Sequence, residues 1–134
     1  MLGSAPIRAY IPASNIERAR KFFPVVSVQN RYNLADREWE EVVGYCEGEK
    51  IGFIPWFPLA TGALAQPGGP LSKASEKLGA TPAQMALAWL LQKSPVMLPI
   101  PGTSKVDHLE SNTEAALLKL DASTTKELER GGRS

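Results

Sequence analysis

The sequence predicts an α/β fold in which short parallel strands alternate with helical crossovers. Several short runs are apolar and rich in β-branched residues, without the alternation of a half-exposed strand. The segments between them carry apolar residues at helical spacing, and capping residues stand at their ends. The order is strand, helix, strand, helix, strand, helices, strand, helix. This order is typical of parallel strands joined by helices, whose ligands bind at the carboxyl ends of the strands.

Composition indicates one globular domain over residues 1–134, with residues 1–6 expected to be disordered. The chain is 43% hydrophobic and 22% charged, with a net charge of +1. This balance gives no electrostatic reason to expect nucleic acid or an anionic membrane as partner. Cys46 is the only cysteine, which excludes an internal disulfide and a cysteine-based zinc site and favours the cytoplasm. We expect no metal site, no membrane-spanning segment and no secretory signal.

The amino-terminal part is expected to form strand 7–11, helix 16–23 and strand 25–29, with a loop at 30–33. Ser14 and Asn15 precede the first of these helices, and Pro24 ends it. The next helix, 37–49, has Asp36 as its expected cap. We expect its glutamates mainly on a solvated face.

The central part is expected to form strand 51–55 and a loop at 60–69 rich in Gly and Pro. A short helix over 70–78 is closed by Gly79. Thr81 caps the following helix, 83–93, with Pro82 at its first position. Because helix 83–93 is apolar almost all round, it should be the most buried helix.

The carboxyl-terminal part begins with an expected buried strand at 95–100, which stops at a Pro101-Gly102 turn. Thr103 and Ser104 are candidate caps for helix 105–119, and Ser123 for a final helix, 124–130. A helix amino terminus offers free N–H groups and positive potential, which suit a phosphate. The alternative is that this segment is only a turn and a cap.

Four strand ends are expected to converge. They are Ser14-Asn15, Gln29-Asn30, Trp56-Phe57 and Gly102-Thr103-Ser104. A flat aromatic, amides and a phosphate-type turn would together suit a nucleotide.

Four segments in order resemble the aldo-keto reductase family. They read VVSVQNRYN (25–33), IGFIPWFPLA (51–60), GATPAQMALAWLLQ (79–92) and LPIPGTSKVDHLESN (98–112). The family's members are (β/α)8, or TIM, barrels that use NADPH to reduce aldehydes and ketones to alcohols. The resemblance implies that this chain is the carboxyl-terminal half of such a barrel, its last four strand–helix units.

The resemblance also implies an NADP(H) site. Gln29 would bind the nicotinamide carboxamide, and Trp56 would stack on the nicotinamide ring. Along the pyrophosphate would run Phe57, Pro58 and Leu59. The 2′-phosphate would lie by the turn of Gly102, Thr103, Ser104 and Lys105, with His108 where many members carry arginine. Asn112 would reach the adenine, and Ser14 and Asn15 match the family's nicotinamide-binding pair or stand there by chance.

Each of these residues also has a purely structural interpretation. Gln29 may only satisfy backbone groups at a strand end, Trp56 may be a core aromatic, and His108 may be an exposed helix residue. Ser111 stands where relatives often carry a glutamate, which puts the adenine contact in question.

The family's proton-transfer machinery is missing from the match. Its aspartate, tyrosine, lysine and histidine belong to the first half of the barrel. Tyr10, Lys21 and His108 are no substitutes, because they lie in the wrong units. The chain is therefore predicted to have no catalytic residues and to be inactive alone. The alternatives are a non-catalytic nucleotide-sensing or protein-interaction module, and an inactive truncated product.

Half a barrel leaves strand edges and inward side chains without neighbours. The inward set is expected to be Val26, Val28, Phe53 and either Val96 or Leu98. We therefore expect the chain to dimerise, to pair with a first-half chain, or to be only marginally folded.

Overall fold

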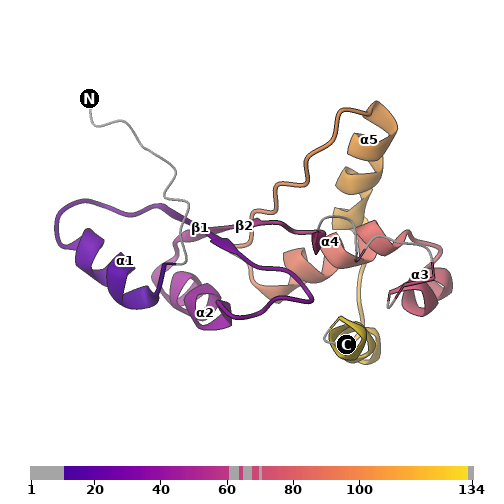
Figure 1. The fold of residues 1–134 in the computed structure, drawn as a ribbon, viewed down its shortest axis with the longest axis horizontal. Helices are drawn as coiled ribbons and strands as arrows, with labels where there is room; N and C mark the ends of the chain where they lie inside the picture. The colour runs from indigo at the N-terminus through magenta and orange to yellow at the C-terminus, as the bar shows by residue number, and fades with distance from the viewer. Residues whose placement is uncertain (1–10, 61–63, 65–67, 70, 133–134) are drawn as a thin grey trace.

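The fold is built on two short parallel strands. The computed structural model describes residues 11–60, 64, 68–69 and 71–132. Strands β1 (Ser27–Arg31) and β2 (Gly52–Trp56) pair in parallel, with Val28 opposite Phe53 and Arg31 opposite Trp56. Helix α1 (Ala13–Arg20) precedes β1, and α2 (Glu40–Glu49) lies between the two strands in the sequence (Figure 1). After β2 come α3 (Ser72–Leu78), α4 (Pro82–Lys93), α5 (Val106–Glu114), a 3-10 turn (Ala115–Leu117) and α6 (Ala122–Gly131). The predicted α/β class with parallel strands is confirmed.

One face of the two strands is buried under helices. Val28 and Phe53 lie on this face and are 5% and 0% exposed. The Tyr32 ring meets Phe53 edge-on at 5.9 Å and stacks on Trp89 of α4 at the same distance. Such large aromatic contacts dominate the burial that holds a small domain together. Seven residues of α4 are buried, so the prediction that this helix is the most deeply packed is confirmed.

The opposite face of the strands is partly exposed, with Ser27 exposed and the other strand side chains half-buried. Side chains alternate along a strand, so residues 27, 29 and 31 share this face with residues 52, 54 and 56. Leu98 lies beside it, since a Cβ on Gly52 would stand 3.2 Å from its Cδ1 atom, and Leu98 is 53% exposed. We call this surface the open face, defined by Ser27, Gln29, Arg31, Gly52, Ile54, Trp56 and Leu98.

The predicted inward set was therefore partly wrong. Val28 and Phe53 face the helices, whereas Leu98 lies at the open face as expected. Both strands begin and end later than predicted, so Asn30 and Arg31 belong to β1 instead of a loop.

The predicted strand 95–100 is reduced to a single bridge between Met97 and Phe53. The Phe53 N–H donates to the Val96 carbonyl and the Leu98 N–H to the Phe53 carbonyl, both at 2.8 Å. Beyond these bonds residues 98–100 run without a ladder, because nothing in the described chain pairs with their other edge.

Several helix boundaries and caps also differ from the predictions. Helix α1 begins at Ala13, so Ser14 and Asn15 lie in its first turn instead of preceding it. Trp39, not Asp36, is the N-cap residue of α2, which begins at Glu40. Asp121, not Ser123, caps α6, accepting from the Thr124 N–H at 2.7 Å.

Two other helix ends agree with the predictions. Thr81 and Gln84 form a reciprocal capping box at the start of α4, with Pro82 in the first turn. Gly79 closes α3 with a φ of 61°, a left-handed conformation that glycine adopts readily.

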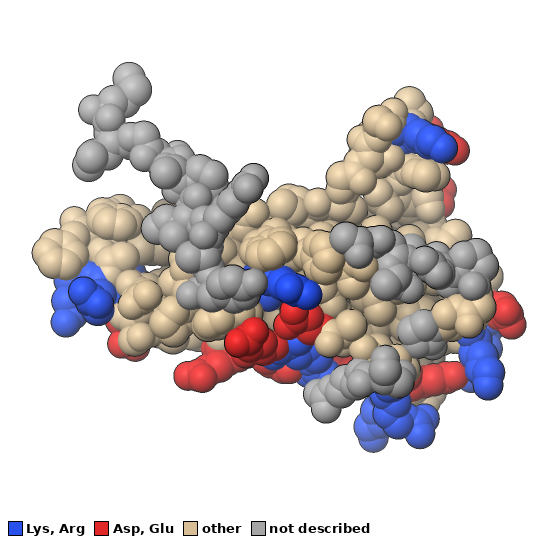
Figure 2. All heavy atoms as spheres, viewed as in Figure 1, with Lys and Arg blue, Asp and Glu red and all other residues tan. Residues whose placement is uncertain are grey.

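A charged cluster joins α2, α4 and α6. Glu40 accepts hydrogen bonds from Arg37 and pairs with Lys93, and Arg37 and Lys93 also pair with Glu129. Both cations lie over the Trp89 ring, at 5.4 and 5.7 Å from its centroid. Figure 2 shows acidic side chains gathered along the molecular edge formed by α2. The sequence pattern placed the glutamates of this helix mainly on a solvated face. Glu40 departs from that expectation, because it joins the charged cluster.

We predict that Glu40 makes stability depend on acid. Burial alone would raise the pKa of this carboxyl, but hydrogen bonds from Arg37 and Lys93 lower it from 4.5 to about 2. A depressed folded-state pKa stabilises the protein above pH 4.5, and this contribution is lost as the pH falls toward about 2. Urea unfolding from pH 6 to 2 should show a shallower decline in Glu40→Gln than in the parent. Glu38→Gln, two residues away, should keep the parent's slope; equal slopes in all three proteins would contradict the role of Glu40.

Candidate functional site

Gln29 and Trp56 lie on the open face toward the carboxyl ends of their strands. The register places Gln29 opposite Ile54 and Trp56 opposite Arg31. Gln29 and Trp56 are half-buried, and within the described chain the Gln29 side-chain amide has no hydrogen-bond partner. A planar aromatic and an available amide on one uncovered sheet face can receive a flat ring that carries a carboxamide. The residues therefore fit a nicotinamide.

The loop after β2 turns sharply at Phe57. Phe57 has a φ of 67°, a costly conformation for a bulky residue, and its ring meets the Trp56 ring edge-on at 6.0 Å. Pro58 is buried and Leu59 packs against the core, so their side chains hold the loop. The buried Pro58 side chain leaves its main chain as the part able to contact a ligand, whereas Leu59 is only half-buried.

Two side chains in this region were not singled out from the sequence. Arg31 stacks over the Phe57 ring, and the buried Asn33 binds the Phe57 carbonyl. The sequence signal was an asparagine followed three residues later by Asp36, a pattern that forms side-chain-to-backbone turns.

The Asn30 side chain links the segment just before α1 with the carboxyl-terminal part of β1. Its side-chain amide donates to the Ile11 carbonyl at 3.0 Å and accepts from the Ile11 N–H at 3.1 Å. The chain reaches α1 directly after this link, so Ser14 and Asn15 lie three and four residues beyond Ile11, which is bonded to β1. Both side chains are exposed.

The predicted phosphate-binding turn stands on a projecting arm. Figure 1 shows the chain rising from the sheet to the outer tip of α5, where that helix begins. Gly102, Thr103, Ser104, Lys105 and His108 are exposed, and no residue of α5 is buried. Asn112 is half-buried. The open face and this turn are thus two separate groups of candidate residues.

The amino terminus of α5 has no side-chain cap, although Thr103 and Ser104 were candidates. Lys105 is the N-cap residue, and its N–H donates to the Thr103 hydroxyl at 3.1 Å. The N–H groups of the first turn therefore face solvent. Asp107 lies in this turn and opposes an incoming anion, whereas the Lys105 side chain favours it.

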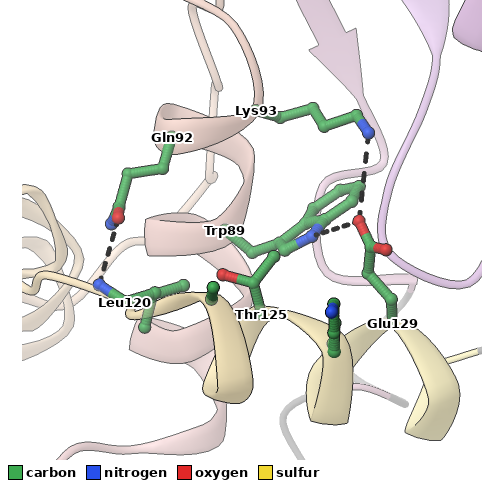
Figure 3. A pocket seen from close by; sticks show the side chains of 8 residues that line it. Trp89, Gln92, Lys93, Leu120, Thr125 and Glu129 are labelled. Carbon is green, nitrogen blue, oxygen red and sulfur yellow. Dashed lines mark hydrogen bonds and ion pairs between the residues drawn. The ribbon is translucent and has the colours of Figure 1, made fainter.

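A cavity of about 440 Å³ between α4 and α6 contains none of the predicted site residues (Figure 3). Its polar groups bond to one another. The Trp89 indole donates to Glu129, while the Gln92 amide donates to the Leu118 carbonyl and accepts from the Leu120 N–H. The cavity is therefore part of the interface through which α6 packs against α4.

No group of three or more His, Cys, Asp or Glu side chains in the described ranges is placed to hold a metal ion. Among the helices described, none has the length and apolar character needed to cross a bilayer.

Comparison with known proteins identifies the family. The model of the aldo/keto reductase family matches residues 9–131. The chain belongs to this family.

Two curated relatives illustrate the similarity. An uncharacterized oxidoreductase of Schizosaccharomyces pombe is 52% identical over 92% of this chain and 40% of its own length. The pyridoxine 4-dehydrogenase of Escherichia coli is 43% identical over 82% of this chain and 38% of its own length. The chain thus spans about 40% of these relatives.

Solved structures agree on the fold. The thermostable aldo-keto reductase Tm1743, crystallised with the inhibitor epalrestat, superposes with a TM-score of 0.81 and 28% identity. The match covers 90% of this chain and 46% of that one. An aldo/keto reductase from Klebsiella pneumoniae, solved with NADP and acetate, gives 0.72 and 25% identity, over 81% and 40% of the two chains. The fold corresponds to about half of a TIM-barrel reductase.

Proposed function

We propose that this chain carries the NADP(H)-binding half of an aldo/keto reductase and supports carbonyl reduction only with a complementary first half. The observation that carries this proposal is the placement of Gln29 and Trp56 together on the open face. The similar reductase from Klebsiella pneumoniae was solved with NADP, which supports the choice of cofactor. The buried, free Cys46 supports a reducing, cytoplasmic setting.

The chain's own residues bind and orient the cofactor. When bound, the nicotinamide supplies a hydride to a carbonyl carbon. Trp56 covers one face of the ring and leaves the other toward the substrate, while the Gln29 amide fixes the ring by bonding its carboxamide. Thr103, Lys105 and the free N–H groups of α5 hold the 2′-phosphate. None of these residues is placed to protonate the carbonyl oxygen, so that proton comes from the partner half.

The partner binds the open face and the outer edge of residues 98–100. Leu98 and Ile100 are 53% and 51% exposed, and Val26, next to β1, is 78% exposed. Each large apolar side chain left in water forgoes about 1.5–3 kcal/mol of burial. On the other side of β2, no described strand pairs with the outer edge of residues 98–100, so this segment can accept another strand. A first-half βα chain supplies both the strand and the apolar cover.

The alternative function is a non-catalytic binding module that uses the same open face. The exposed apolar residues favour interaction with a protein, whereas the Gln29 and Trp56 pair favours a dinucleotide. Separate measurements of cofactor binding and of partner-dependent turnover distinguish the two functions.

We predict that Trp56 contributes to cofactor binding through its ring. Trp56→Ala should weaken NADPH binding about tenfold, or about 1.4 kcal/mol, because the stacking surface is lost. Trp56→Phe should retain most of the affinity. Fluorescence titration measures NADPH, and calorimetry measures adenosine 2′-monophosphate, whose affinity should not change. An equal loss for both ligands would argue against stacking, and no binding of NADPH by the parent would contradict the proposed cofactor.

We predict that activity requires the missing half. The chain should form a one-to-one complex with the amino-terminal part of the Schizosaccharomyces pombe relative and then oxidise NADPH with an aldehyde. Leu98→Asp should prevent the complex, because it places a charge at the open face. Leu117→Asp is the matched control, since Leu117 is 80% exposed but lies on the 3-10 turn after α5.

Analytical ultracentrifugation measures the complex, and NADPH absorbance measures turnover. Aldehyde reduction by the chain alone would overturn the assignment of the proton donor to the partner. A stable, cooperatively folding monomer that ignores the added half would refute the proposed docking.

A further inference from the structure

Phe57 occupies a conformation that other groups must maintain. A positive φ costs a bulky residue free energy and persists only where the surroundings enforce it. The Phe57 carbonyl accepts the Ala60 N–H at 3.2 Å, which closes the turn locally. The remaining restraints come from the end of the neighbouring strand and the loop after it.

The buried Asn33 amide reaches across to this carbonyl. Its Oδ1 atom accepts the N–H groups of Ala35 and Asp36, both at 2.9 Å. These two bonds fix which way the amide points, so its Nδ2 atom is directed at the Phe57 carbonyl, 3.0 Å away. Asn33 is 0% exposed, and water cannot readily replace this bond if it is lost.

Arg31 restrains the ring of the same residue. Its guanidinium lies 5.0 Å from the centroid of the Phe57 ring, while its Nε atom pairs with the Asp36 carboxylate at 2.8 Å. Asp36 also bonds Asn33 through the backbone in both directions. The end of β1 and the loop after it therefore hold Phe57 at its ring and at its carbonyl.

We infer that Asn33 and Arg31 are positioning residues for the dinucleotide site, acting through Phe57. This inference rests on the proposed function and on the resemblance, which implies that Phe57, Pro58 and Leu59 run along the pyrophosphate. A fixed carbonyl and ring set the direction in which the following peptide groups point. They also hold Trp56, the preceding residue, against the cofactor ring. Neither positioning residue needs to touch the cofactor.

The test removes the Asn33 donor while preserving its shape. Asn33→Asp keeps an oxygen for the Ala35 and Asp36 N–H groups but faces the Phe57 carbonyl with a second oxygen. NADPH binding should weaken about tenfold in the full chain, whereas adenosine 2′-monophosphate, which lacks the pyrophosphate and nicotinamide, should bind within twofold of the parent. Unchanged NADPH affinity, or equal loss of both ligands, would overturn the inference.

Gln92→Glu is the matched control. It makes the same amide-to-carboxylate change at a side chain that also donates to a loop carbonyl. The Gln92 amide donates to the Leu118 carbonyl at 2.9 Å, in the interface between α4 and α6. Its NADPH affinity should equal that of the parent. If Asn33→Asp fails to fold, Arg31→Lys tests the restraint on the Phe57 ring, because it keeps the charge but loses the planar stacking. It should weaken NADPH about threefold and leave adenosine 2′-monophosphate unchanged; parental NADPH affinity in that variant would refute the inference.

A second readout separates this inference from the proposed function. Fluorophenylalanine can be incorporated and its ¹⁹F resonance at residue 57 assigned from Phe57→Leu. Asn33→Asp should shift that resonance and Gln92→Glu should not, whether or not NADPH binds. If the parent fails to bind NADPH while the Phe57 resonance responds to Asn33→Asp, the proposed cofactor is rejected. The restraint of Phe57 by Asn33 is then still supported. An unchanged Phe57 resonance in Asn33→Asp would refute the claim that Asn33 restrains Phe57.

Discussion

The burial of Phe53 and Val28 against Tyr32 and Trp89 is the constraint on which the rest of the structure depends. Side chains on a strand alternate with a period of two, so fixing one face fixes the other. With Val28 and Phe53 under the helices, Gln29 and Trp56 must lie on the open face. A slip of one residue would exchange these sets and hide the amide and the indole in the core. The candidate site is therefore a consequence of core packing on the opposite face of the same strands.

Local sequence patterns predicted the elements that are stabilised by residues close together in the sequence. Helix α4 has its capping box, its first-turn proline and its all-round apolar surface within one stretch of sequence, and it formed as expected. The predicted strand 95–100 failed because a strand is completed by partners that lie elsewhere in the chain or outside it. The apolar stripe of α5 was real, but Val106 and Leu109 remain 71% and 57% exposed because no described element covers them. Periodicity identifies a face; it does not supply what packs against it.

The candidate site divides in the same way. Recognisable motifs contained Gln29, Trp56 and the turn at Thr103, and the strand register then brought Gln29 and Trp56 onto one face. Asn33 and Arg31 could not be assigned from sequence, because their contacts depend on which residue of β2 lies opposite each residue of β1. Asp36 illustrates the same limit. It has the chemistry of a helix cap, but its carboxylate pairs with Arg31 instead.

The composition of the open face changes along the strands, and under the proposed function this gradient would link partner binding to cofactor binding. At the amino-terminal end, Gly52 and Leu98 present a flat, uncharged surface suited to packing against another apolar layer. At the carboxyl end, Gln29 and Trp56 offer an amide and a ring suited to a ligand. A partner that covers the apolar end excludes water from the neighbouring ligand end and strengthens each polar contact there. By linkage, a cofactor that prefers the covered state favours the partner by the same factor. Half a barrel with such a face would therefore bind its two partners cooperatively, since both use the surface that the helices leave uncovered.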